Sequence, residues 1–302
     1  SQIAGGASAG PLYLGLRAFG APRLVAVAGS VLSAFGTTLL FSSADARAPY
    51  AAHSVAMLCM SVAFAFAARG GPPWAVGAAI GLATLARVPA IAVTPALALL
   101  AARGSGAPAR VVMPRVLLAV APFALALLAY DLLRFGSPFD TGYARLVRGD
   151  IFFSQGLFSP FYLPRQLEAL LLLAPDIVEG TPWMLRLQFA GTSLLITTPA
   201  FLWVFAGLRA VRRERSVAAV AAAALLGLLP AVFFGSTGAP QVGYRYSIDV
   251  QPFLVALACT GAAAATGVWR RTPSILFILA CVISLAVNVY AAIAVLRFGY
   301  WE

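Results

Sequence analysis

Apolar segments close to twenty residues long limit what this chain can fold into. Segments 111–133 and 273–296 are clear cases, with hardly a charge inside them. About 20 consecutive apolar residues suffice for a helix to cross the hydrocarbon core of a bilayer. Only 10% of the 302 residues are charged, against roughly a quarter in a soluble domain. We therefore predict an all-α fold, a polytopic bundle of transmembrane helices.

Nine segments are candidate spans, and residues 9–19 resemble the end of a tenth. The nine are 22–41, 50–68, 73–87, 88–102, 111–133, 190–211, 216–234, 248–268 and 273–296. The chain shows no soluble domain and no internal repeat, so we expect a single transmembrane domain over 1–302. The chain begins at Ser1 in a stretch that already runs into an apolar segment, and we expect it to be part of a longer protein.

The distribution of arginine predicts the orientation. All 21 basic residues are Arg, and the formal net charge is +11. One set of loops holds twelve of these Arg and a single acid, Glu214; the set is 17–23, 69–72, 103–115, 209–215 and 270–271. Short cytoplasmic loops are enriched in Arg, so this set is expected inside. The basic charge then indicates topology and contact with anionic lipid, not a nucleic-acid partner. With so much Arg and Ala, we expect a bacterial inner membrane.

The longest loop, 134–189, falls on the opposite, periplasmic side. Counted from Asp131, it carries six of the ten acids together with many aromatic residues. Within it, Pro164 to Ala174 is too short to span and predicts an interfacial helix that begins at a proline. Such a loop can form a lid over a lipid-facing cavity. The alternative is an inert connector whose aromatics anchor at headgroup level.

Three outer-face positions are candidate binding residues. Arg87 lies at the tip of a helical hairpin, His53 near the outer end of its helix, and Arg245 beside Tyr246 in GYRYSID. Guanidinium groups bind phosphate oxygens in a bidentate manner, and at headgroup depth they suit a phosphate on a lipid tail. The simpler alternatives are snorkelling arginines and a packing histidine. No metal site is predicted, because His53 lacks visible ligand partners.

Five segments together resemble the C-superfamily (GT-C) glycosyltransferases, which use polyprenyl-phosphate sugars and include protein O-mannosyltransferases and aminoarabinose transferases. The segments are FGTTLLFSSADARAPYAAHS, GAAIGLATLARVPAIAVTPALALL, RFGSPFDTGY, GTSLLITTPAFLW and GYRYSIDVQPFL. The resemblance implies an inverting transfer of a sugar from a polyprenyl-phosphate donor to a hydroxyl of a glycan, lipid or protein acceptor, at the periplasmic face. It implies no definite cofactor and leaves a divalent cation open.

The resemblance also implies residue roles. Arg87, and Arg245 with Tyr246, would bind the lipid phosphate, while His53 would face the cavity. The first span and first outer loop of the family are expected to precede Ser1, and the catalytic acid with them. Asp45 is the candidate substitute within the chain. Two other functions stay open: a transporter or flippase of lipid-linked saccharides, and a non-catalytic membrane subunit.

Overall fold

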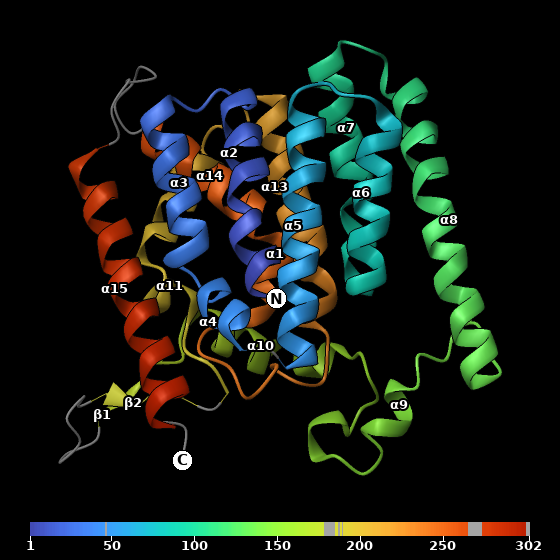
Figure 1. Cartoon of the computed structure of the whole chain (residues 1–302), viewed down its shortest axis with the longest axis vertical. Helices are drawn as coiled ribbons and strands as arrows, with labels where there is room; N and C mark the ends of the chain where they lie inside the picture. Colours follow the sequence, from blue (N-terminus) through green and yellow to red (C-terminus); the bar gives the residue numbers. More distant parts are fainter. Residues whose placement is uncertain (46, 178–184, 187, 189, 265–273, 300–302) are drawn as a thin grey trace.

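The computed structural model is built almost entirely of helices (Figure 1). It describes residues 1–302 except 46, 178–184, 187, 189, 265–273 and 300–302. The first half of the chain forms α1 (Gln2–Ala7), α2 (Ala9–Ala18), α3 (Arg23–Phe35), α4 (Leu39–Ala44), α5 (Ala48–Ala68), α6 (Pro73–Ala86), η1 (Val88–Val93), α7 (Thr94–Ser105) and α8 (Ala109–Phe135).

The second half begins with short elements and then returns to long helices. The short elements are α9 (Tyr143–Leu146), η2 (Ile151–Phe153), η3 (Pro160–Tyr162), α10 (Leu163–Leu171), β1 (Asp176–Ile177), β2 (Leu185–Arg186), α11 (Leu194–Thr197) and η4 (Pro199–Phe201). The others are α12 (Leu202–Leu208), α13 (Arg215–Val232), η5 (Arg245–Val250), α14 (Gln251–Ala264) and α15 (Ile275–Phe298). Strands β1 and β2 pair antiparallel, with Asp176 opposite Arg186.

Five helical segments of the described chain are long and apolar enough to cross a membrane. They are Ala48–Ala68, Val88–Ser105, Ala109–Phe135, Arg215–Val232 and Ile275–Phe298. Arg23–Phe35, Pro73–Ala86 and Pro199–Leu208 are apolar but shorter. The membrane character predicted from composition therefore agrees with the helices that form.

Two of the predicted spans are interrupted. Segment 22–41 breaks at Gly36, which caps α3, and the chain restarts as α4. Segment 190–211 is divided into α11, η4 and α12, because Pro199 lacks the amide hydrogen that would continue the first helix. Proline and glycine thus shorten helices that hydropathy alone would have drawn as continuous.

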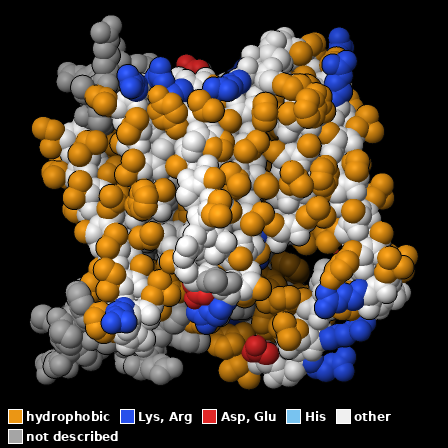
Figure 2. Space-filling view, in the orientation of Figure 1, with side chains coloured by type: hydrophobic (Ala, Val, Ile, Leu, Met, Phe, Trp, Pro, Cys, Tyr) orange, Lys and Arg blue, Asp and Glu red, His pale blue; other side chains and the backbone are white. Residues whose placement is uncertain are grey.

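The exterior of the bundle is apolar between its two ends. Figure 2 shows hydrophobic side chains across the middle of this face, with most of the charged side chains near its upper and lower edges. On α15, Ile275 and Leu276 are 78% and 68% exposed. Side chains of this kind favour hydrocarbon over water by roughly 1.5–3 kcal/mol each. A lipid environment accounts for this surface.

Connections gather at two ends of the bundle. The α2–α3, α5–α6, α7–α8 and α12–α13 turns lie at the upper end in Figure 1. The lower end holds α4, the α6–η1 corner, the segment from α9 to β1, strand β2, and the chain that leads from α13 into η5. The four turns at the upper end belong to the arginine-rich set of loops, whose remaining member, 270–271, lies outside the described residues.

The long loop folds back beneath the bundle. Its helix α10 covers most of the predicted interfacial helix and buries Gln166, Ala169 and Leu170. The Gln166 amide nitrogen donates to the carbonyls of Phe234 and Ser236 at 2.7 and 2.9 Å. Tyr244 donates its hydroxyl to the amide oxygen of Gln166 at 2.8 Å. The loop is therefore tied to the segment that precedes η5.

Candidate functional site

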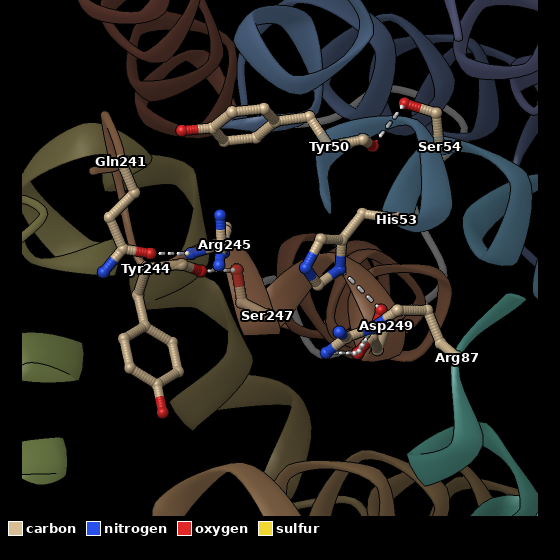
Figure 3. Close-up of polar contacts among 9 residues, drawn as sticks. All are labelled: Tyr50, His53, Ser54, Arg87, Gln241, Tyr244, Arg245, Ser247 and Asp249. Atoms are coloured by element: carbon tan, nitrogen blue, oxygen red, sulfur yellow. Dashed lines mark hydrogen bonds and ion pairs between the residues drawn. The ribbon is translucent and has the colours of Figure 1, made fainter. Parts of the chain in front are cut away.

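The centre of the candidate site is the buried carboxylate of Asp249. Its Oδ1 lies 2.8 Å from Nδ1 of His53 on α5 (Figure 3). Its Oδ2 accepts from Nε and Nη2 of Arg87, at 3.2 and 3.1 Å. His53 and Asp249 are 0% and 4% exposed. One carboxylate therefore joins α5, the end of α6 and η5.

Local sequence places Arg87 at this junction. Helix α6 ends at Ala86, and Arg87 is extended, with φ −145° and ψ 103°. Pro89 follows two residues later and lacks the amide hydrogen that would continue α6. The chain turns here, so the Arg87 side chain leaves the end of the helix toward η5.

Three arginines and two tyrosines form a row that we call the arginine–tyrosine ladder: Arg47, Tyr50, Arg245, Tyr246 and Arg87. The guanidinium carbons of Arg47 and Arg245 lie 5.1 and 5.2 Å from the ring centre of Tyr50. Those of Arg245 and Arg87 lie 5.6 and 5.4 Å from the ring centre of Tyr246. Arg245 therefore shares a ring with each of the other two arginines.

The two outer arginines of the ladder have carboxylate partners. Arg47 pairs with Asp45 at 2.6 Å, and Arg87 with Asp249. Burial works to raise the pKa of Asp45, but the hydrogen bonds and charge of Arg47 outweigh it and lower that pKa. Arg245 has no carboxylate within ion-pair distance among the described residues, and its buried Nε has no hydrogen-bond partner there. With His53 neutral, three arginines and two carboxylates leave one net positive charge, at the middle of the ladder.

The backbone around Arg245 is held closely. Its amide donates to Oε1 of Gln241 at 2.9 Å. The same Gln241 donates through Nε2 to the carbonyls of Ala190 and Thr237. Gly238 has φ +100°, and a Cβ there would lie 2.9 Å from Nε of Arg245. A side chain at this position would be strained and would crowd the guanidinium, so glycine is required for both reasons.

Three aromatic side chains of the long loop pack against Phe234, which follows α13 and contacts the ladder. We call Tyr143, Phe153, Phe158 and Phe234 the aromatic cover. The rings of the first three lie 5.3–5.5 Å from that of Phe234, which lies 6.1 Å from Tyr246. Burial raises the pKa of the Tyr143 phenol. Figure 2 shows a hollow below α6, between the body of the protein and the segment from α8 to α9.

The structure brings together the residues that the sequence singled out for phosphate binding. Arg87, Arg245, Tyr246 and His53 lie in one cluster, whereas Asp45 lies at the far end of the ladder with its carboxylate bound by Arg47. Sequence reasoning missed Asp249. The available signal was an acid four positions after Arg245, at the start of an apolar helix. The described residues contain no group of three His, Cys, Asp or Glu that could hold a metal ion.

Searches against protein-family models, curated proteins and solved structures returned no match for this chain.

Proposed function

We propose that the chain binds a lipid-borne phosphodiester at the arginine–tyrosine ladder, as the donor site of a membrane glycosyltransferase. The reaction moves a sugar from a polyprenyl-phosphate donor to an acceptor hydroxyl at the outer face of a bacterial inner membrane. The observation that carries the proposal is Arg245, a guanidinium without a carboxylate partner among the described residues, held between two tyrosines.

The charge of the ladder favours a monoanion. A phosphodiester that links a sugar to a prenyl chain carries a single negative charge. This charge balances the one net positive charge that the ladder arginines keep when their partners Asp45 and Asp249 are counted. A diphosphate link carries two and would leave one uncompensated. Uncompensated charge in a partly buried site is costly, so the ladder suits the monophosphate donor better.

The proposed chemistry uses arginine for the leaving group. As the bond from the anomeric carbon to the phosphate oxygen breaks, negative charge grows on the lipid phosphate. Arg245 provides a fixed positive charge there, and Arg87 adds a second guanidinium that Asp249 holds in place. Fixed donors that face developing charge lower the barrier without reorganising during the reaction.

The membrane arrangement supports the same proposal. We propose nine full spans and one partial span, with the arginine-rich turns at the upper end of Figure 1 in the cytoplasm. The ladder and the 134–189 loop then belong to the periplasmic side. The ladder lies at one end of the bundle and not at mid-depth, where a transporter would place its charged residues.

Arg245 offers a direct test. The chain in lipid nanodiscs should bind a polyprenyl-phosphate sugar, and Arg245→Ala should weaken this binding and slow sugar transfer by roughly 10²–10³-fold. Arg245→Lys should restore only part of this loss, because lysine keeps the charge without the planar fork. Arg209→Ala, an exposed arginine at the opposite end, is the matched control. Unchanged binding in both Arg245 variants would remove the ladder from the site.

A further inference from the structure

Only one of the two ring nitrogens of His53 has a hydrogen-bond partner among the described residues. A carboxylate accepts hydrogen bonds, so Nδ1 of neutral His53 carries the proton that lies between it and Oδ1 of Asp249. Nε2 then bears a lone pair. It is buried and has no hydrogen-bond partner among the described residues. Buried polar atoms in native proteins are nearly always satisfied, so this atom calls for a partner beyond the described residues.

The free nitrogen belongs to the same cluster as the unpaired guanidinium. The centres of the His53 and Tyr246 rings lie 5.9 Å apart. The guanidinium carbon of Arg245 lies 5.6 Å from the centre of the same Tyr246 ring. Figure 3 shows the second ring nitrogen of His53 on the side away from Asp249, toward Arg245. A phosphate beside Arg245 and a hydroxyl that donates to Nε2 would satisfy both orphan atoms.

Asp249 itself is poorly placed to take a proton. Its Oδ1 faces His53, and its Oδ2 accepts two hydrogen bonds from Arg87. A carboxylate occupied in this way serves better to fix the histidine tautomer and to stabilise a positive imidazolium. The charged groups around His53 are therefore Asp249 on one side and Arg87 and Arg245 on the others.

We propose that Nε2 of His53 takes the proton of the acceptor hydroxyl; this inference rests on the proposed transferase function. The hydroxyl oxygen forms a bond to the anomeric carbon as its proton moves to Nε2. The bond from that carbon to the phosphate oxygen breaks, and its electron pair leaves with the lipid phosphate beside Arg245. Because Nε2 is buried, the acceptor reaches it when the aromatic cover lifts from Tyr246.

Two substitutions separate a proton acceptor from a structural histidine. The Asn side chain of His53→Asn places an amide N–H near the position of Nδ1, where it can still donate to Asp249, and it has no atom at the position of Nε2. The Gln side chain of His53→Gln places its amide near the position of Nε2. We expect His53→Asn to bind the polyprenyl-phosphate sugar with an affinity within about threefold of that of the unmodified chain. Its transfer rate should fall by roughly 10²–10⁴-fold and lose its dependence on pH, because a general base contributes about that much. Near-normal transfer by His53→Asn would overturn the inference.

The chain contains a single histidine, which gives a readout that does not require turnover. In protein labelled with ¹⁵N-histidine, Nδ1 should carry the proton and Nε2 should give the signal of an unprotonated nitrogen. Adding the lipid-phosphate sugar together with an acceptor should shift the Nε2 signal to that of a hydrogen-bonded nitrogen. The Arg245→Ala protein should bind the sugar donor weakly and should therefore not show the shift of the Nε2 signal.

The outcomes distinguish the two proposals. If the polyprenyl-phosphate sugar binds and the Nε2 signal does not respond to donor plus acceptor, the role of His53 is wrong and the donor site stands. If the unmodified chain binds no polyprenyl-phosphate sugar, the proposed function fails and the inference fails with it. Should His53→Gln and His53→Asn both lose thermal stability and donor binding together, the histidine is structural.

Discussion

Among the described residues, partly buried arginines occur at one end of the bundle and not at the other. At the end with the α2–α3, α5–α6, α7–α8 and α12–α13 turns, the described arginines are exposed, and Glu214 is the acid among them. At the other end, Arg87 and Arg245 are partly buried, stacked on Tyr246, and held near the buried Asp249. The number of arginines in the loops therefore indicates how the bundle is oriented in the membrane. The burial and the partners of individual arginines indicate where a ligand binds. Four experiments test this contrast.

The largest expected effect is a difference between the two ends in the labelling of single cysteines from outside the cell. In a variant without Cys59, Cys259 and Cys281, we place a single cysteine by Ser105→Cys at one end or Leu146→Cys at the other. Because the arginine-rich end should face the cytoplasm, an impermeant maleimide added outside intact cells should label only the Leu146→Cys protein. The Ser105→Cys protein should react after the membrane is opened. The reverse pattern would invert the proposed orientation.

Removing an acid should affect the two ends very differently. Asp249→Ala leaves Arg87 without its carboxylate in a buried setting, which costs about 3–5 kcal/mol of unfolding free energy. Glu214→Ala changes an exposed side chain and should stay within about 0.5 kcal/mol. Chemical unfolding in detergent measures both. Equal, small effects would show that the buried pair does not stabilise the fold.

A smaller effect is expected from the ladder's shared ring. Tyr246→Leu removes the aromatic face that Arg87 and Arg245 both contact, and should cost about 1–2 kcal/mol. Tyr246→Phe keeps that face and should stay close to the unmodified chain. The same unfolding measurement applies. If both substitutions cost the same, packing or the hydroxyl matters and the cation–π contacts do not.

The smallest expected effect is that of pH on the exposed end of the ladder. Arg47 lowers the pKa of Asp45 in the folded protein, so the pair stabilises the fold above the unfolded pKa, near 4. This stability, below about 1 kcal/mol for a pair with one exposed partner, is lost as the pH falls through the lowered folded pKa. Asp45→Asn should remove this acid dependence. An acid response that is unchanged in Asp45→Asn must come from other carboxylates.

The sequence predicted those features that depend on neighbouring residues. Helical segments follow from runs of apolar residues, and the two sets of loops follow from the arginines between them. Arg87 and Arg245 were recognised because a charge at the edge of an apolar helix is costly without a partner. Each of these features depends on residues that lie within about twenty positions of one another in the sequence.

The features that the sequence did not predict depend on contacts between distant residues. Asp249 is 196 positions from His53 and 162 from Arg87. Nothing in the segment that contains Asp45 and Arg47 indicates that the neighbouring Tyr50 meets Arg245. The interruptions at Gly36 and Pro199 were visible in the sequence, but hydropathy outweighed them in the prediction of spans.

The distance along the chain between Arg87 and Asp249 has a consequence for biosynthesis. Arg87 emerges from the ribosome 162 residues before its carboxylate, which takes roughly 10–30 s at ordinary rates of synthesis. During that time the guanidinium must remain near water or lipid phosphate, since hydrocarbon cannot accommodate it. The pairing of Arg87 and His53 with Asp249 can therefore take place only after η5 has been made. Assembly of the site is thus a late event, and a stalled or truncated nascent chain would present a free Arg87 at the membrane surface.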